Sequence, residues 1–346
     1  MSRKPRPPRR AGARSRARQS LGLLVVAALA VISLTAAWVI WSYRGPGPAA
    51  PEGAVTTVIL KRGSGVTQIA GELKDAGVIA SSAVFLATVR FTGATGDLKA
   101  GEYAFKSRTS MARVLADIRD GKVVRHYVTI PEGWTSEMAV EAVLRSPVLA
   151  GDVTAPPEGA ILPDTYQVQR GDDRGVVIAR MRKARDTLLV ELWAKRQPGL
   201  PITTPEQAVT LASIVEKETA LGAERPRIAA VFTNRLRAGM RLESDPTIIY
   251  GVSKGRALGR GIRASELAGL TPYNTYLVDG LPPTPIANPG REALAAVMNP
   301  PATTDLFFVA DGSGGHVFAA DFAQHQRNVV RWRQVERRQA AEGAKP

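Results

Sequence analysis

The sequence predicts an α+β protein with a single N-terminal transmembrane helix, then a small α+β module, and then a larger mixed α+β domain. Its 346 residues exceed the size of one ordinary domain, which is about 150 residues. An uncharged apolar run of 21 residues near the N-terminus has the length of a membrane span. After that run, short β-branched patterns alternate with patterns of helical spacing. Because 45% of the residues are hydrophobic and 22% are charged, the chain can bury a sizeable core.

The composition excludes several kinds of chemistry. The sequence contains no cysteine, which rules out thiol nucleophiles, thiolate zinc sites, iron–sulfur clusters and disulfides. The three histidines, His126, His316 and His325, are too few for most multi-histidine sites and lack metal-ligand spacing. We therefore expect no metal and no other cofactor, and a reaction that rests on oxygen and nitrogen groups.

Positive charge is concentrated at the N-terminus. The formal net charge is +15, and residues 1–20 contribute eight basic residues and no acid. The other 326 residues carry only +7. An arginine-rich segment beside a membrane span is explained by membrane topology. We therefore interpret residues 1–20 as a cytoplasmic arm and expect no nucleic-acid partner.

Residues 21–43 are the predicted transmembrane anchor. Leu21 to Trp41 carries no charge, and at 1.5 Å per residue it can cross a hydrocarbon core of about 30 Å. Trp38, Trp41 and Tyr43 lie at its far end, where interface aromatics are common. The positive-inside rule then keeps the N-terminus in the cytoplasm and places everything after the span outside.

A cleaved signal peptide is the alternative for this segment. Ala28-Leu29-Ala30 resembles a cleavage triplet. The apolar run continues for eleven residues beyond it, however, which exceeds the length of an ordinary signal-peptide core. The pattern therefore favours an uncleaved anchor.

The chain after the span begins with a predicted stalk and a small module. Residues 44–54 are dense in proline and glycine, which cannot continue a helix. Residues 55–122 form the predicted module, whose order of strand, helix, helix, strand and helix is typical of an α+β fold. Its expected elements are Val55–Leu60, Val66–Lys74, Ser81–Val89, Gly101–Phe105 and Thr109–Arg119.

Residues 123–335 form the predicted larger domain, and residues 336–346 a flexible tail. The expected early elements of the larger domain are the strand Val123–Ile130 and the helices Thr135–Leu144 and Asp172–Arg196. The segment Gly280–Gly290 is too rich in proline to be a helix or a central strand, and we expect it to form a rigid wall.

The segment after Thr204 has the most informative pattern. Thr204 and Gln207 form a Thr-x-x-Gln capping box, and Pro205 suits the first helical position. An apolar stripe at helical spacing follows and reaches Val215. The sequence therefore predicts a helix with a buried face that begins here.

Two carboxylates, Glu216 and Glu218, end this stripe. Residues two apart on a helix are rotated by about 200°, so these two cannot form one dyad. Glu218 extends the apolar edge, where partial desolvation raises a carboxyl pKa and favours a general acid. Glu216 is a secondary possibility and is more typical of a structural or ion-pair residue. A solvent-exposed pair at a helix end remains the alternative for both.

A rival motif is Gly251–Gly255, which matches the G-x-S-x-G pattern of serine hydrolases and follows a strand-like segment, Thr247–Tyr250. Asp305 and His316 come later, in hydrolase order. A nucleophile elbow must lead into a helix, however, and Arg256–Gly261 is a poor helix former. The pattern therefore argues against a serine hydrolase.

Polar residues crowd into turn-rich segments downstream of Glu218. Such side chains beside rigid loops suit a carbohydrate, because sugar hydroxyls bind neutral donors and acceptors and sugar C–H faces pack on aromatic rings. The residues predicted to hold a glycan are Asn234, Asp245, Thr247, Tyr273, Asn274 and Thr275. Taken singly, each is also explained as an ordinary capping or turn residue.

Several segments follow one another in the order of a known family. They are Gly101–Phe105, Leu162–Tyr166, Leu211–Thr219, Val231–Leu236, Ser244–Thr247, Tyr273–Tyr276, Gly280–Pro283 and Phe307–Ala310. With them the chain resembles the YceG-like endolytic murein transglycosylases over most of its length after the span. The resemblance implies a single-pass protein of the cell inner membrane, with a cytoplasmic N-terminus, a LysM-like module and a catalytic domain on the periplasmic or extracytoplasmic side.

The resemblance also implies an activity. The family's catalytic glutamate corresponds to Glu218. The implied substrate is the nascent peptidoglycan glycan strand near its synthases, and cleavage ends the elongation of that strand. A glycan hydrolase usually needs two carboxyl groups, whereas a lytic transglycosylase can use one. On this hypothesis Glu218 cleaves the bond between N-acetylmuramic acid and N-acetylglucosamine and leaves a 1,6-anhydro end.

Two other interpretations stay open at the level of sequence. One is a non-catalytic peptidoglycan-binding scaffold of the wall synthesis complex. The other is a glycan hydrolase that pairs Glu218 with a second acid such as Asp245 or Glu243.

Overall fold

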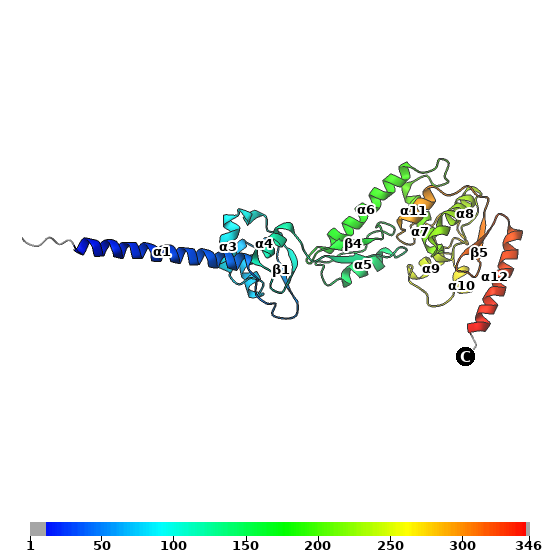
Figure 1. Ribbon diagram of the computed structural model, residues 1–346. Helices are drawn as coiled ribbons and strands as arrows, with labels where there is room; N and C mark the ends of the chain where they lie inside the picture. Colours follow the sequence, from blue (N-terminus) through cyan, green and yellow to red (C-terminus); the bar gives the residue numbers. More distant parts are fainter. Residues whose placement is uncertain (1–11, 344–346) are drawn as a thin grey trace, which may run out of the picture. The chain divides into compact units, whose positions relative to one another are not determined.

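The computed structural model describes residues 12–343, with side chains for residues 22–339 (Figure 1). The chain divides into two compact units, Met1–Arg125 and His126–Pro346, whereas the sequence places this boundary between residues 122 and 123. Within the described residues, helices and small two-stranded sheets make up both units. The predicted mixed α+β class with one N-terminal apolar helix is confirmed.

Helix α1 (Gly12–Arg44) contains the apolar run. Its segment Gly22–Arg44 is long and apolar enough to cross a membrane, and side chains such as Leu34 are exposed, here to 71%. Such a helix near an N-terminus fits either a membrane anchor or a signal sequence. The helix begins within the predicted basic arm, whose first eleven residues lie outside the described part of the chain.

The rest of the first unit packs helices and two antiparallel strands around one core. Strand β1 pairs with β2 so that Val55 lies opposite Lys106 and Leu60 opposite Gly101. The core is lined by large apolar side chains, of which Tyr103 and Phe85 are fully buried. The elements are β1 (Val55–Leu60), α2 (Val66–Asp75), α3 (Ser82–Phe91), the 3-10 helix Ala94–Gly96, β2 (Gly101–Lys106) and α4 (Met111–Asp120).

The segment predicted as a stalk lies against this unit. The Gly47 N–H donates to the Arg108 carbonyl at 3.2 Å, and the Arg108 N–H donates to the Pro48 carbonyl at 3.0 Å. The Ala50 N–H donates to Ser107 Oγ at 3.0 Å. Tyr43, at the end of α1, packs on the core of the unit. The polypeptide between α1 and β1 is therefore tied to the loop between β2 and α4.

The second unit begins with a small sheet and two helices. Strands β3 (His126–Thr129) and β4 (Thr165–Val168) pair antiparallel. Helices α5 (Ser136–Arg145) and α6 (Arg174–Ala194) share a core with them. The side chain of Asp173 caps α6 by accepting the Val176 N–H at 3.0 Å, because an N-cap side chain satisfies a backbone donor that has no helical partner.

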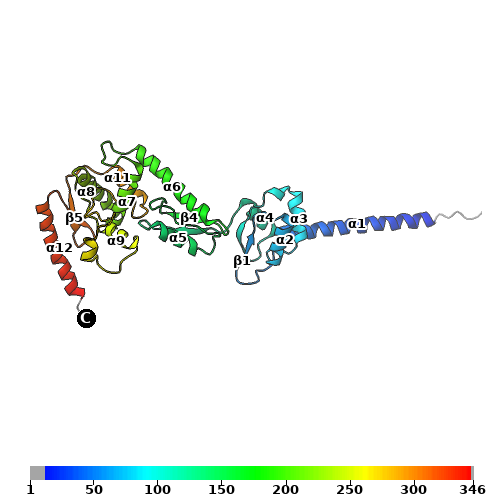
Figure 2. The same cartoon turned by 180° about the vertical axis from the view of Figure 1, so that it is seen from behind.

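Helices α7 (Pro205–Glu218), α8 (Arg225–Arg237) and α11 (Arg291–Met298) pack around the largest core (Figure 2). Strands β5 (Phe307–Ala310) and β6 (His316–Ala319) form a hairpin next to α8, and α12 (Phe322–Gly343) packs on both strands. Helix α12 runs through most of the predicted flexible tail, and residues 344–346 lie outside the described part.

One predicted element is wrong. Thr247–Tyr250, expected to be strand-like, lies inside helix α9 (Asp245–Ser253), which is followed by the short helix α10 (Ala264–Leu267). Pro246 sits in the first turn of α9, where a missing N–H costs nothing. The β-branched residues suggested a strand, but burial of Thr247 and Ile248 against the domain outweighs that weak preference.

The proline-rich segment Gly280–Gly290 is neither helix nor strand, as predicted. Asn288 within it is fully buried and ties two distant loops together. Its Nδ2 donates to the Trp134 carbonyl at 3.0 Å, and its Oδ1 accepts the Ile161 N–H at 3.1 Å. This amide fixes the segment against the start of the second unit.

We expect Asn288→Ala to lower the free energy of unfolding by about 2–4 kcal/mol, because it leaves the buried Ile161 N–H without an acceptor. Urea unfolding measures the change. Asn299→Ala, which alters an exposed asparagine, is the matched control and should change it by less than about 0.5 kcal/mol. Equal losses in the two variants would contradict the role given to Asn288.

Candidate active site

Glu218 is the last residue of α7. The helix begins as predicted, because Thr204 Oγ1 accepts the Gln207 N–H at 3.2 Å and Pro205 occupies the first turn. It ends at Glu218 because Thr219 takes an extended conformation, with φ −140° and ψ 138°. The carboxyl group of Glu218 therefore projects from the C-terminal end of a helix whose last turns are otherwise buried in the core.

Ser244 is the hydrogen-bond partner of Glu218. Its hydroxyl donates to Glu218 Oε1 in a short contact. Ser244 itself is held by two threonines, since its N–H donates to Thr275 Oγ1 at 3.0 Å and its carbonyl accepts from Thr247 Oγ1 at 2.6 Å. The two threonine hydroxyls lie 2.9 Å apart. Thr247 and Thr275, both predicted to bind a glycan, are buried and hold Ser244 in place.

The surroundings of Glu218 favour its protonated form. Burial raises the pKa of Glu218 to about 7, and the negative charge of Asp245 acts in the same direction. The hydrogen bond from Ser244 and the charges of His316 and Arg235 oppose this shift. Because the residue is also partly exposed, its carboxyl group can hold a proton near neutral pH and still be reached from solvent.

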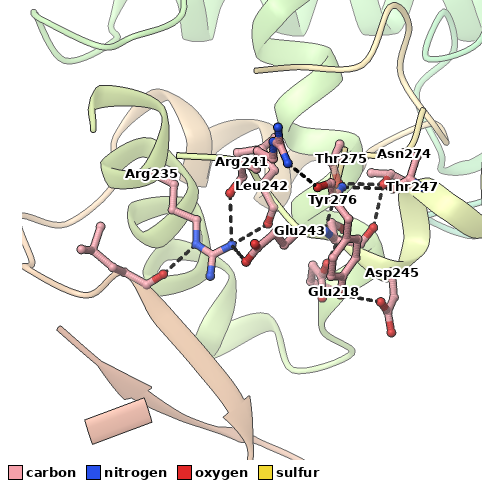
Figure 3. A network of polar contacts seen from close by, with 12 residues as sticks. Glu218, Arg235, Arg241, Leu242, Glu243, Asp245, Thr247, Asn274, Thr275 and Tyr276 are labelled. Carbon is pink, nitrogen blue, oxygen red and sulfur yellow. Dashed lines mark hydrogen bonds and ion pairs between the residues drawn. The ribbon is translucent and has the colours of Figure 1, made fainter. Parts of the chain in front are cut away.

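Asp245 is the second carboxylate near Glu218. It is exposed at the start of α9, and it accepts a hydrogen bond from the Tyr276 hydroxyl at 2.7 Å (Figure 3). Burial, and then the hydrogen bond to Asp245, raise the pKa of Tyr276 above its ordinary value. The tyrosine therefore stays a neutral donor that orients the Asp245 carboxylate.

Asn274 builds the loop that carries these residues. Its side chain is 1% exposed, and Nδ2 donates to the carbonyls of Leu267 and Gly269, each at 2.8 Å. Its Oδ1 accepts the Tyr276 N–H at 3.1 Å. Asn274 therefore has its side-chain donors and acceptor committed within the protein.

Tyr273 joins this loop to the proline-rich segment. Its hydroxyl lies 2.8 Å from Thr284 Oγ1, and its ring lies 4.9 Å from the ring of Tyr250. Lys254 Nζ lies 5.3 Å from both ring centres. Tyr273 is partly exposed, so part of its aromatic surface can contact a ligand.

Asn234 and Arg235 face a different segment, the loop before β5. Asn234 Nδ2 donates to the carbonyls of Thr303 and Asp305 at 2.9 and 3.0 Å. The buried Arg235 guanidinium donates from Nε to the Leu306 carbonyl at 2.7 Å and from an Nη to the Leu242 carbonyl at 2.9 Å. Both residues therefore connect α8 to the segments on either side of it.

Glu216 has different partners from Glu218, and with Arg225 it forms the buried part of an ion cluster. It lies 2.7 Å from Arg225, and its other oxygen accepts the Gly290 N–H at 2.9 Å. The same guanidinium reaches Glu132 at 3.0 Å and Glu292 at 2.6 Å. Burial raises the pKa of Glu216 in spite of these partners. The cluster ties the end of α7 to the start of α8 and to the proline-rich segment.

Gly290 packs closely against Glu132. A Cβ atom at position 290 would lie 1.8 Å from a carboxylate oxygen of Glu132, so any other residue there would require the Glu132 side chain to move. Gly290 thus lets the proline-rich segment approach Glu216 closely enough to donate its N–H.

Glu224 and His316 form a pair near the residue that follows Glu218. Glu224 Oε2 lies 2.7 Å from His316 Nδ1, and Oε1 accepts the His316 N–H at 2.8 Å. Although burial acts to raise it, these bonds hold the pKa of Glu224 below its ordinary value. Glu224 also accepts from Thr219 Oγ1 at 3.4 Å, so it links β6 to the end of α7.

The rival serine-hydrolase pattern does not assemble. Ser253 Oγ lies 2.8 Å from the Ile249 carbonyl oxygen and 2.6 Å from that of Arg256, so its single O–H is taken up by backbone carbonyls. Asp305 is 2.7 Å from Arg227, and His316 is held by Glu224. Among the side chains that the structure describes, those of residues 22–339, no group of three or more acidic or histidine residues is placed to hold a metal ion.

The sequence indicates the carboxylates of the site but not the residues that bind them. Ser244 could have been found, because a serine directly before Asp245-Pro246 marks a helix start. Arg225 and the pairing of Glu224 with His316 have no local signal, since their partners are remote in sequence.

Because the pKa of Glu218 is raised, ionising it in the folded state costs stability as pH rises from its ordinary value of 4.5 through about 7. Glu218→Gln removes that cost. We expect the free energy of unfolding of the variant, relative to that of the original protein, to rise by about 1–3 kcal/mol from pH 5 to pH 8. Urea unfolding at both pH values measures the gain, and a difference that does not change with pH would contradict a raised pKa.

Comparison with known proteins identifies the family to which this chain is similar. A protein of Streptococcus pneumoniae serotype 2 named endolytic murein transglycosylase is 28% identical over 324 residues, which cover 79% of this chain and 58% of that protein. A protein of the same name from Bacillus subtilis is 27% identical over 299 residues, covering 77% and 81% of the two chains. This chain therefore spans little more than half the length of its pneumococcal relative.

Structure agrees with sequence. The crystal structure of a YceG-like protein from Listeria monocytogenes matches with a TM-score of 0.51 and 27% identity, over 79% of this chain and 98% of that one. Residues 58–331, most of the chain, match the YceG-like family. The chain therefore belongs to the YceG-like family.

Proposed function

We propose that this chain is a membrane-anchored endolytic murein transglycosylase and that Glu218 is its general acid and then its general base. The observation that carries the proposal is the state of Glu218, a partly exposed carboxyl group whose pKa is raised to about 7. Such a group is protonated in a large fraction of molecules at neutral pH. The names of the pneumococcal and Bacillus relatives support the same activity.

The proposed substrate is the nascent peptidoglycan glycan strand. Protonated Glu218 donates its proton to the oxygen between N-acetylmuramic acid and N-acetylglucosamine as that bond breaks. The positive charge at the anomeric carbon is spread toward the sugar's own acetamido oxygen. The Glu218 carboxylate then takes the proton of the muramyl 6-hydroxyl, whose oxygen bonds to the anomeric carbon. The new end is a 1,6-anhydro sugar, and no water is consumed.

The hydrogen bond from Ser244 has a direct role in this cycle. It stabilises the carboxylate that exists between the two proton transfers, while burial stabilises the acid before and after them. The opposed effects keep the pKa close to neutrality, where a group can both give and accept a proton. Thr247 and Thr275 contribute by fixing Ser244.

The residues predicted to hold the glycan divide by exposure. Asp245 and Tyr273 have surface available to a sugar, and we assign them direct contacts. Asn274 is buried and committed to its own loop, so we assign it the shape of that loop. Asn234 retains partial exposure while it anchors the loop before β5, and its glycan contact stays a prediction.

The first unit supports the anchoring part of the proposal. Its apolar helix has the length of a membrane span, and the basic residues before it favour a cytoplasmic N-terminus in the cell inner membrane. The order β1, α2, α3, β2 supports a LysM-like module. Release of nascent strands would take place beside the peptidoglycan synthases, which we propose as partners.

Glu218→Gln should lower the rate of glycan cleavage by about 10²–10⁴-fold, because the amide cannot donate the required proton. Glu216→Gln, the matched change two residues away, should keep the rate within about tenfold, because Arg225 keeps Glu132 and Glu292 as ion-pair partners and the end of α7 stays in place. Cleavage by the full-length protein in detergent is followed by mass spectrometry of the fragments. Loss of cleavage in Glu216→Gln with full activity in Glu218→Gln would move the role of general acid to Glu216. No cleavage by the original protein would favour a binding scaffold.

A two-carboxylate glycan hydrolase is the second candidate, because the exposed Asp245 lies close enough for its charge to affect Glu218. A hydrolase would use Asp245 to activate water or to attack the sugar.

The masses of the products separate the two candidates. Hydrolysis adds one water to each pair of ends, whereas transglycosylation leaves anhydro ends of unchanged total mass. For a transglycosylase, Asp245→Asn should leave product identity unchanged and lower the rate by less than about tenfold. Water-containing ends that disappear in Asp245→Asn would establish the hydrolase instead.

A further inference from the structure

The side of the first unit next to the end of α1 carries an unusual apolar surface. Phe91, the last residue of α3, is 94% exposed. It borders a hollow of about 620 Å³ between α1 and α3. Single exposed apolar residues are common, but here the exposed ring adjoins a concave surface. The lining residues are Val39, Ile40, Tyr43, Arg44, Ala87, Thr88, Phe91 and Thr92.

The hollow lies level with the outer end of the apolar helix. Twenty residues at 1.5 Å per residue cover about 30 Å, so a span that begins at Gly22 leaves the hydrocarbon close to residue 42. Val39 and Ile40 on one wall of the hollow are therefore within a turn of that boundary. Phe91, on the other wall, lies at the same depth, in the interface where aromatic rings are favoured.

Several contacts hold this side of the unit against α1. Tyr43 packs on its core, and the residues after α1 are hydrogen-bonded to the loop between β2 and α4. Arg44 lines the hollow, Arg90 directly precedes Phe91 in the sequence, and both arginines are exposed. Their positive charge complements anionic lipid headgroups at this depth.

We propose that the first unit binds the membrane surface through the face formed by Phe91 and the hollow beside α1, with lipid as the occupant. The inference rests on the proposed membrane anchor. Phe91 enters the interface between headgroups and acyl chains, lipid fills the hollow, and Arg44 and Arg90 contact phosphate groups. The first unit thereby lies on the bilayer.

The absence of cysteine from the chain allows a direct test, because one introduced cysteine can be labelled without background. Three variants of the full chain carry an environment-sensitive fluorophore: Leu34→Cys in the span, Phe91→Cys, and Ile59→Cys. Ile59 is 47% exposed on β1, which lies on the side of the unit away from the apolar part of α1 (Figure 1). All three sites are exposed, so the changes leave the core intact. The proteins are reconstituted into phosphatidylglycerol-containing vesicles with nitroxides at the lipid headgroup or along the acyl chain.

We expect strong quenching at position 34 by the acyl-chain nitroxide, and shallow-nitroxide quenching at position 91 that exceeds that at position 59 by about threefold or more. Quenching at 34 but equal, weak quenching at 91 and 59 would overturn this inference and leave the anchor standing. No quenching at 34 would overturn the anchor and the inference together. Disulfide cross-linking of unlabelled Phe91→Cys in vesicles, with no lipid quenching at 91, would assign the face to a second copy of the chain and also overturn it.

Discussion

The site depends on a carboxyl group at the boundary between a packed helix and solvent. Glu218 ends α7, whose preceding turns are buried in the largest core, so the protein removes most of the water that would stabilise a carboxylate. One short hydrogen bond from Ser244 returns part of that stabilisation. The balance sets the pKa of Glu218 near 7 rather than near 4.5. Without the surrounding core, the same residue would be an ordinary surface glutamate.

Glu216 and Glu218 lie on one helix turn but have very different surroundings. Both carboxyl groups lose water, but only Glu216 has an arginine and a backbone N–H directed at it. Removing Arg225 would leave the buried Glu216 carboxylate without its ion-pair partner, which is strongly destabilising. Its partners are therefore structural, and they hold the helix end that presents Glu218. The two glutamates divide between them the tasks of positioning and proton transfer in the proposed reaction.

Much of the architecture could be predicted from the sequence, because it follows from local signals. The capping threonine and first-turn proline located α7, and alternating helix and strand patterns located the elements of the first unit. The helical offset of two residues separated Glu216 from Glu218. Long-range pairing could not be predicted, since nothing near Arg225 in the sequence indicates Glu132 or Glu292. Helix α9 was missed because its β-branched residues resemble a strand, and only packing against the domain makes them helical.

The tied connection after α1 has a mechanical consequence. A flexible linker would let the distance between the first unit and the membrane vary. Here the backbone hydrogen bonds of Gly47 and Pro48 with Arg108 fix the linker against the unit. The end of the apolar helix and the first unit are thus joined at a fixed height, because Tyr43 also packs directly on the core of the unit. Glycines inserted between α1 and β1 would lengthen the connection, but they would leave the contacts of α1 with α3 and α4 in place.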